Sequence, residues 1–213
     1  MKEIKKKHLE RTDFLKGELK DVQFDDPMKM FSTWYQEAHE KNCPEPHAVV
    51  LTTATLDAKP SSRIVYMREL VEEGFVIYTN YLSRKGSEIT ENPNAALLFY
   101  WDCCERQVRI EGTIEKIDPL ISDDYFDARP RMSQIGAWAS EQSQQIPDRQ
   151  SLEDRVAYFE EKFPTKVPRP PHWGGLLVKP VYFEFWQGRL GRLHDRICYQ
   201  NNDKTWSNFR IAP

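Results

Sequence analysis

The chain is organised around one stretch near its C-terminal end, Glu184-Phe185-Trp186-Gln187-Gly188-Arg189-Leu190-Gly191-Arg192-Leu193-His194-Asp195-Arg196. If its last part is a strand, Arg192, His194 and Arg196 share one face, because side chains alternate along a strand. Leu193 and Asp195 then point to the opposite face. Three potential cations on one face repel one another unless an anion lies beside them. Two explanations fit this pattern equally well: a bound anion, or a solvated polar face on an edge strand.

The composition is that of an ordinary globular protein. The chain has 213 residues, of which 39% are hydrophobic and 12% aromatic, enough for one domain with a substantial core. The formal net charge of −3 makes a broad nucleic-acid-binding surface improbable. Any affinity for anions must therefore come from local clusters of arginine.

The four cysteines, Cys43, Cys103, Cys104 and Cys198, include no zinc-type CxxC pair. We interpret them as reduced thiols of a cytoplasmic protein. No apolar segment follows the basic start, so we do not expect a secretory signal. The sequence has no long apolar run, so no membrane helix is predicted. The histidines lack metal-ligand spacing, so no metal site is predicted.

The pattern of elements predicts an α+β fold. We expect a mobile arm over residues 1–24 and a single domain over 25–213. Asp26 caps a first helix that has Pro27 at its first position. Further helices are expected over 83–92, 119–128, 134–139 and 151–163, and strands over 48–56, 62–68, 75–80, 95–101, 106–117, 174–178, 181–187, 192–199 and 205–211. Many short antiparallel strands with added helices favour a closed β-barrel.

Two further segments are candidate anion sites. Ser83-Arg84-Lys85 opens a predicted helix, where free amides favour a phosphate. A serine cap followed by surface charges explains it as well. Arg129-Pro130-Arg131-Met132-Ser133 follows another helix and by itself is an ordinary solvated loop. Neither common glycine-rich phosphate loop is present. Three such sites predict more than one phosphate, or a large anionic cofactor with an anionic substrate.

Several motifs, in order, resemble the pyridoxine/pyridoxamine 5′-phosphate oxidases. They are Arg63-Ile64-Val65, Tyr78-Thr79-Asn80-Tyr81-Leu82-Ser83-Arg84-Lys85-Gly86, Arg106-Gln107-Val108-Arg109-Ile110-Glu111-Gly112, Ser133-Gln134-Ile135-Gly136-Ala137-Trp138, Glu184-Phe185-Trp186-Gln187-Gly188, Arg192-Leu193-His194-Asp195-Arg196 and Ile211-Ala212-Pro213. The resemblance covers nearly the whole chain from Asp25 onward. It implies a split β-barrel homodimer with flavin mononucleotide (FMN) at the subunit interface.

The resemblance also implies roles for individual residues. Arg63, Arg84 and Lys85 are expected to hold the flavin phosphate. The rest of the cofactor is expected to contact Ile64, Val65, Tyr78, Thr79, Gln107, Gln142, Ser143, Trp186 and Arg196. The substrate phosphate is expected at Arg68, Tyr125, Arg129 and Ser133, and the substrate ring at the catalytic pair Arg192 and His194. Arg11 and Phe14, in the arm, are expected to cover the ligand.

The implied reaction oxidises pyridoxamine or pyridoxine 5′-phosphate to pyridoxal 5′-phosphate, a step of vitamin B6 metabolism. A hydride passes to FMN, and O2 then takes the electrons and yields H2O2. Three positions depart from the family pattern: Arg68 replaces a usual lysine, Phe14 replaces a usual tyrosine, and Gly191 lies in an unusual spacer. The alternatives are a phenazine-biosynthesis flavoenzyme of the same superfamily, a non-catalytic flavin or pyridoxal-phosphate carrier, and a heme-linked or deazaflavin protein of similar fold.

Overall fold

The computed structural model describes residues 13–19, 24–203 and 205–213. These residues form two compact units. Unit 1 comprises the described residues up to 46, with 98–110 and the described part of 181–213, and unit 2 comprises 47–97 and 111–180. Arg11 lies outside the described residues, and the division into an arm (1–24) and a domain (25–213) stays a prediction.

Five α-helices and nine strands are present in the described part of the chain. Unit 1 contains α2 (Pro27–Glu40), the 3-10 turns η1 (Asp102–Cys104) and η2 (Leu190–Arg192), β8 (Asp195–Asn202) and β9 (Thr205–Arg210). Unit 2 contains β1 (Ala48–Ala54), β2 (Pro60–Tyr66), β3 (Glu69–Val71), β4 (Gly74–Asn80), α3 (Arg84–Glu91), α4 (Pro119–Asp127), α5 (Arg131–Ala139) and α6 (Arg149–Lys162). Both units share β5 (Asn94–Trp101), β6 (Arg106–Lys116) and β7 (Trp173–Gln187).

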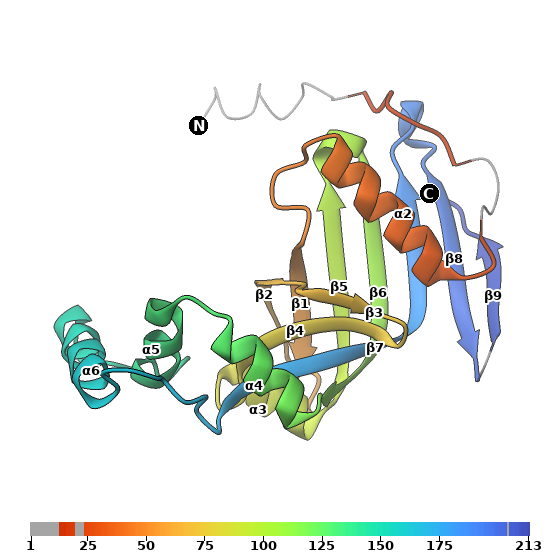
Figure 1. The fold of residues 1–213 in the computed structure, drawn as a ribbon. Helices are drawn as coiled ribbons and strands as arrows, with labels where there is room; N and C mark the ends of the chain where they lie inside the picture. Colours follow the sequence, from red (N-terminus) through yellow and green to blue (C-terminus); the bar gives the residue numbers. More distant parts are fainter. Residues whose placement is uncertain (1–12, 20–23, 204) are drawn as a thin grey trace, which may run out of the picture. The chain divides into compact units, whose positions relative to one another are not determined.

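The described strands join in one sheet in the order β2-β1-β5-β6-β7-β4-β3, with β8 paired to β7 and β9 to β8 (Figure 1). Antiparallel register is seen between β1 and β2, β3 and β4, β4 and β7, β7 and β8, and β8 and β9. This confirms the α+β class. The described strands end at β2, β3 and β9, which fits a split barrel better than the closed barrel expected from strand pattern alone.

The core of unit 1 is aromatic. Asp26 caps α2 by accepting a hydrogen bond from the Met28 amide, and Pro27 occupies the first turn, as the sequence predicts. Helix α2 buries one face, on which the Phe31 ring lies 4.9 Å from Phe99 and the Trp34 ring 5.2 Å from Phe185. Aromatic pairs at these distances add to the free energy gained by burial alone.

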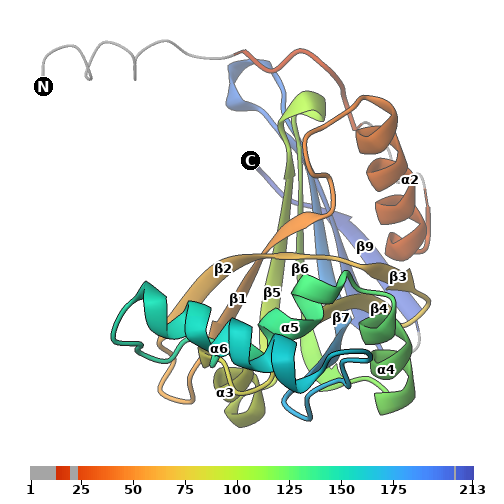
Figure 2. The ribbon, with the colours of Figure 1, turned by 60° about the vertical axis from the view of Figure 1, so that its left-hand side comes forward.

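The core of unit 2 gathers α4, α5 and α6 into one group (Figure 2). Phe126 of α4, Ile135 of α5 and Trp173 of β7 are buried together there, and Phe159 of α6 packs against them. Helix α6 has no buried residue and packs through the half-buried side chains of Val156 and Phe159. This group carries one wall of the site described below.

The C-terminal region differs from the sequence prediction in two ways. The predicted strands 174–178 and 181–187 are one continuous strand, β7, which pairs with β4 in its first half and with β8 in its second. Strand β8 begins at Asp195, so Arg192 and His194 precede it. The strand alternation expected for these residues is therefore wrong, and Leu193 is 73% exposed.

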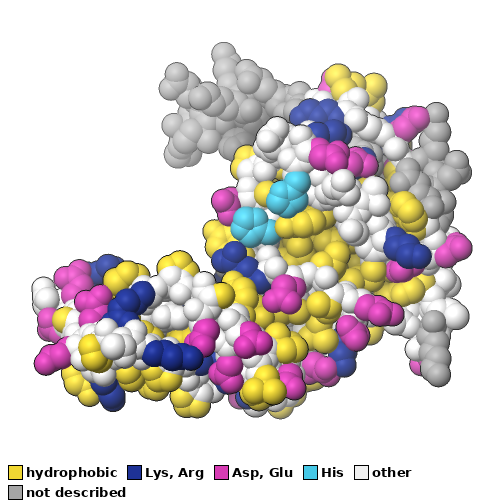
Figure 3. Space-filling view, in the orientation of Figure 1, with side chains coloured by type: hydrophobic (Ala, Val, Ile, Leu, Met, Phe, Trp, Pro, Cys, Tyr) yellow, Lys and Arg dark blue, Asp and Glu magenta, His cyan; other side chains and the backbone are white. Residues whose placement is uncertain are grey.

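A disulfide joins Cys43 to Cys103, whose Cα atoms are 5.5 Å apart. The prediction of reduced thiols is wrong for this pair, because the two residues are far apart in sequence and meet only in the fold. Cys104 and Cys198 are free and buried. None of the described helices has the length and apolar character needed to cross a membrane. Basic and acidic side chains are mixed over the face shown in Figure 3.

Candidate active site

Unit 2 contains a cavity of about 540 Å³, here called the β2–α3 pocket. It receives side chains from β2, β4 and the start of α3. Its lining includes the predicted cofactor residues Arg63, Ile64, Val65, Tyr78, Thr79, Arg84, Lys85, Gln142 and Ser143. Residues separated by up to 80 positions in the sequence are thus brought to one cavity.

The start of α3 gives this pocket its buried charge. Ser83 caps the helix, and the Lys85 ammonium donates hydrogen bonds to Thr79 Oγ1 (3.0 Å), Ser83 Oγ (3.1 Å) and Gln142 Oε1 (2.7 Å). All three acceptors are neutral. Burial, and then the charge of Arg63, lower the pKa of Lys85 to about 8. A cation in this state gains from a nearby anion.

Two arginines share one carboxylate beside Lys85. Glu88 is 3% exposed and lies 3.4 Å from Arg63 Nη2 and 2.8 Å from Arg84 Nε. Burial alone would raise the pKa of Glu88, but hydrogen bonds from Ser61 and Thr53 and the Arg84 guanidinium lower it to about 2. One carboxylate therefore pairs with two of the three cationic side chains that line this pocket. The residual positive charge fits a phosphate, as on FMN.

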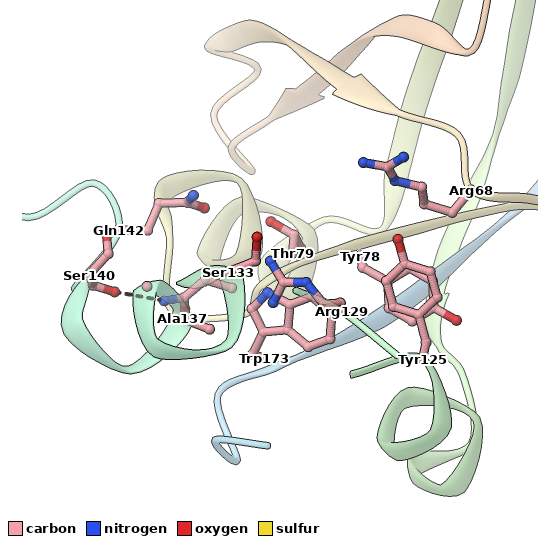
Figure 4. Close-up of a pocket in the computed structure, with 12 residues that line it drawn as sticks. Arg68, Tyr78, Thr79, Tyr125, Arg129, Ser133, Ala137, Ser140, Gln142 and Trp173 are labelled. Atoms are coloured by element: carbon pink, nitrogen blue, oxygen red, sulfur yellow. Dashed lines mark hydrogen bonds between the residues drawn. The ribbon is translucent and has the colours of Figure 1, made fainter. Parts of the chain in front are cut away.

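A second cavity of about 390 Å³, here called the β4–α5 pocket, is also in unit 2. Its lining includes all the predicted substrate-phosphate residues of this unit, Arg68, Tyr125, Arg129 and Ser133. Figure 4 shows the Arg129 guanidinium beside the Trp173 ring and the Arg68 side chain over the same cavity.

Arg129 has a buried polar atom that no described residue pairs with. Its guanidinium carbon lies 4.4 Å from the centroid of the Trp173 ring, and its buried Nη1 atom has no hydrogen-bond partner among the described residues. Burial lowers the pKa of Arg129, and the charge of Arg68 acts in the same direction. An unpaired buried donor costs free energy of about 1–3 kcal/mol, so it marks the place of an absent acceptor.

The two pockets adjoin. Arg68, Tyr78, Thr79 and Gln142 line both of them. The Tyr78 ring stacks on Tyr125 at 3.7 Å between centroids, and Trp173 continues the stack. The arrangement can hold two flat ligands side by side, each with its anionic end toward its own group of cations.

Three predicted residues meet in unit 1. The Trp186 and His194 rings are 4.6 Å apart, and Phe14 lies edge-on, 5.5 Å from each. His194 Nδ1 accepts a hydrogen bond from the Arg189 amide at 3.1 Å. Burial, and then the Arg192 charge, lower the pKa of His194. Its neutral ring therefore carries the proton on Nε2.

The other predicted residues of unit 1 do not join these rings. Arg192 is exposed, lies in η2 with a φ of 64°, and makes no hydrogen bond or ion pair with any described residue. Arg196 donates to Glu184 Oε1 and to the Ala212 carbonyl. Gln107 is half-buried on β6. The repelling row of three cations expected from the sequence is therefore absent.

Two carboxylates were missed by reasoning from sequence. Asp195, expected to face away as a bystander, accepts hydrogen bonds from Arg189, Arg210 and the Leu19 amide. It thereby joins the described part of the N-terminal segment to β8. Glu88 follows Arg84 by four positions on a helix, a spacing that could have predicted the pair.

The comparisons with known proteins show the family of the chain. Residues 35–163 match the family model of pyridoxamine 5′-phosphate oxidase, and residues 173–213 match the C-terminal dimerisation region of pyridoxine 5′-phosphate oxidase. The chain is 49% identical to the pyridoxine/pyridoxamine 5′-phosphate oxidase of Cupriavidus metallidurans, over 88% of this chain and 89% of that protein. It is 47% identical to the Synechocystis enzyme of the same name, over 95% and 96%.

Solved structures confirm the split β-barrel fold. PhzG from Burkholderia lata, in complex with tetrahydrophenazine-1-carboxylic acid, is similar with a TM-score of 0.86, covering 92% of this chain and all of that chain. Its 28% identity is well below the 46–50% shared with the oxidases, so the phenazine-type alternative is not favoured. A pyridoxamine 5′-phosphate oxidase-related, FMN-binding protein from Nostoc punctiforme shares the fold with a TM-score of 0.70.

The family model of the C-terminal region indicates a homodimer, and the oxidase relatives indicate a small-molecule substrate. The cations of the β2–α3 pocket fit the phosphate of FMN. The chain therefore belongs to the pyridoxine/pyridoxamine 5′-phosphate oxidase family of FMN-dependent oxidoreductases.

Proposed function

We propose that this protein oxidises pyridoxamine or pyridoxine 5′-phosphate to pyridoxal 5′-phosphate, with O2 as electron acceptor and H2O2 as product. One observation carries this proposal: two adjoining cationic pockets, each suited to one phosphate, share a wall. A cofactor phosphate and a substrate phosphate require such a pair. When bound, FMN supplies the two-electron acceptor that the oxidation needs.

The cofactor belongs in the β2–α3 pocket. Arg63, Arg84 and Lys85 hold its phosphate, because they outnumber the single carboxylate of Glu88. The remaining residues that line the pocket, named above, contact the rest of the cofactor. We place Gln107, Trp186 and Arg196 of unit 1 on the cofactor as well, at an interface between the two subunits.

The substrate phosphate belongs in the β4–α5 pocket. Arg129 Nη1 offers it an unused donor, and Arg68 adds a second charge. Tyr125 and Ser133 add neutral hydroxyl groups. Two guanidinium groups with two hydroxyls match the several oxygens of a phosphate monoester better than those of a carboxylate.

His194 and Arg192 orient the substrate ring. Neutral His194 presents its Nε2–H group, since its Nδ1 atom is engaged by the Arg189 amide. Exposed Arg192 remains available to a ligand. Phe14, which packs on Trp186 and His194, together with Arg11, covers the ligand and excludes water.

The direct test begins with the absorbance spectrum of the freshly purified protein, followed by addition of pyridoxamine 5′-phosphate in air. We expect a flavin spectrum, formation of the aldehyde product, and an equal amount of peroxide. Tight binding of FMN and pyridoxal 5′-phosphate without turnover would indicate a carrier. Turnover of tetrahydrophenazine-1-carboxylic acid alone would indicate the phenazine type. The cytoplasmic location stays a prediction, which cell fractionation checks.

A further inference from the structure

Three cysteine sulfurs lie together in unit 1, and none of the three residues is assigned above to FMN or substrate. Cys43 follows α2, whereas Cys103 and Cys104 form the turn η1 between β5 and β6. In addition to the Cys43–Cys103 disulfide, Cys104 Sγ lies 3.8 Å from Cys43 Sγ and 3.5 Å from Cys103 Sγ. A free thiol thus touches both sulfurs of a disulfide.

The three cysteines differ in how far solvent reaches them. Cys43 is 7% exposed and Cys104 is 2% exposed, while Cys103 is only half-buried. The flanking backbone is hydrogen-bonded, since the Cys43 amide donates to the Ala38 carbonyl and the Glu105 amide to the Asp102 carbonyl. Cys43 and Cys104 are therefore the two buried members of the group, and Cys103 is the one that solvent reaches.

We propose that Cys43, Cys103 and Cys104 form a thiol–disulfide exchange site whose external partner is a small-molecule disulfide. The Cys104 thiol loses its proton and attacks Cys43 Sγ. The Cys43–Cys103 bond breaks, a Cys43–Cys104 bond forms, and Cys103 leaves as a thiolate that takes up a proton. No net oxidant is consumed in this step.

Exchange moves the free thiol from a buried position to a half-exposed one. Released Cys103 then attacks an external disulfide, which gives a mixed disulfide on Cys103 and one equivalent of small thiol. Without Cys104, Cys103 stays in its disulfide and offers no thiol. The site thus takes a ligand of the glutathione-disulfide class, independently of the oxidase function proposed above.

The test uses the full-length protein incubated with oxidised glutathione, trapped with acid and alkylated. Tandem mass spectrometry then locates each linkage. Wild type is expected to show Cys43–Cys103, Cys43–Cys104, and glutathione on Cys103. C104S is expected to show Cys43–Cys103 alone, with at least a tenfold loss of glutathione on Cys103. C103S is expected to form Cys43–Cys104.

C198S is the matched control. Cys198 is buried and accepts a hydrogen bond from the Tyr182 hydroxyl, so its removal should leave the three linkages unchanged. The proposal is overturned if C103S keeps Cys43 and Cys104 as free thiols, or if C104S acquires as much glutathione as wild type. Should C103S fold poorly, absence of a Cys43–Cys104 linkage in wild type overturns it equally.

A soft metal ion is the competing occupant, because the three sulfurs lie within 4.8 Å of one another. Elemental analysis of the protein as purified decides this point. Metal binding would replace exchange if wild type contained one equivalent of zinc or copper and three reduced thiols. In that case C104S should have lost the metal. Metal-free protein with the disulfide present supports exchange.

Discussion

The guanidinium of Arg129 lies against the Trp173 ring, and its buried Nη1 atom has no partner in the described part of the chain. Nearby, Lys85 is held by neutral oxygens only. Such groups lower the stability of the protein without ligand. They raise its affinity for a phosphate, because the ligand removes the cost of the unpaired charge.

Substituting Arg129 by methionine keeps much of the side chain's volume and removes its charge. Loss of a charge-assisted hydrogen bond costs about 1.5–3 kcal/mol, so KM for pyridoxamine 5′-phosphate should rise by roughly 10- to 150-fold. Steady-state kinetics on R129M measures this. The matched control is R131M, since Arg131 donates to the backbone carbonyls of Phe163 and Thr165 and does not line the pocket. An equal rise of KM in both variants would contradict the assignment.

The lowered pKa of Lys85 predicts how FMN binding depends on pH. Its pKa of about 8 in the protein without ligand means that it loses its charge as pH rises through 8. The second pKa of a phosphate monoester is about 6, so the ligand's own charge is constant above pH 7. FMN affinity should therefore fall above pH 8, by at most about tenfold per pH unit.

Fluorescence titration of FMN between pH 7 and 9.5 measures this dependence. The comparison variant is K85M, which should bind more weakly at pH 7 but with a flatter pH profile. A wild-type affinity that does not change over this range would contradict the role of Lys85.

At the scale of elements, α3 presents its charges only because the chain turns sharply before it. A Cβ atom on Gly86 would lie 2.0 Å from the Tyr81 carbonyl oxygen, a backbone atom that cannot move aside. The start of α3, with Arg84 and Lys85, depends on this close approach.

G86A should therefore lower stability by roughly 1–3 kcal/mol, and each kcal/mol lowers Tm by about 2–4 °C in a protein of this size. G136A is the contrast, because a Cβ there meets nothing within 4 Å inside helix α5. It should raise stability by roughly 0.4–1 kcal/mol. Thermal melts of the two variants test the pair, and similar shifts in both would contradict the argument.

The elements also show what sequence could and could not predict. Strong local signals, such as Asp26-Pro27 before α2 and Ser83 before α3, predicted the helix starts correctly. The expected strand over 192–199 was wrong at its start, because Gly191 and Arg192 adopt positive φ and the strand begins only at Asp195. Of the three cations, Arg196 alone lies in β8. The alternation of side-chain types along the sequence does not show where such a change of backbone conformation occurs.

At the scale of the whole molecule, the order of the motifs predicted the family. The partner of each charged side chain could not be predicted, because it depends on long-range packing. No local pattern places the Asp195 carboxylate against the Leu19 amide, or Cys43 beside Cys103. The two adjoining pockets likewise depend on segments that meet only in the fold.

Placing FMN at the subunit interface predicts that flavin stays with the dimer. Analytical ultracentrifugation should show one species of twice the 25.2 kDa chain mass that carries the flavin absorbance. Dilution to monomer should release the flavin, since the contacts from the second subunit would be lost. Flavin that remains on a monomer would contradict the interface site.

The most direct measurement is a crystal structure with FMN and pyridoxal 5′-phosphate bound. We predict the flavin phosphate at Arg63, Arg84 and Lys85, and the substrate phosphate within hydrogen-bond distance of Arg129 Nη1. Either phosphate bound elsewhere, or an Arg129 Nη1 still without a partner in the complex, would contradict the account.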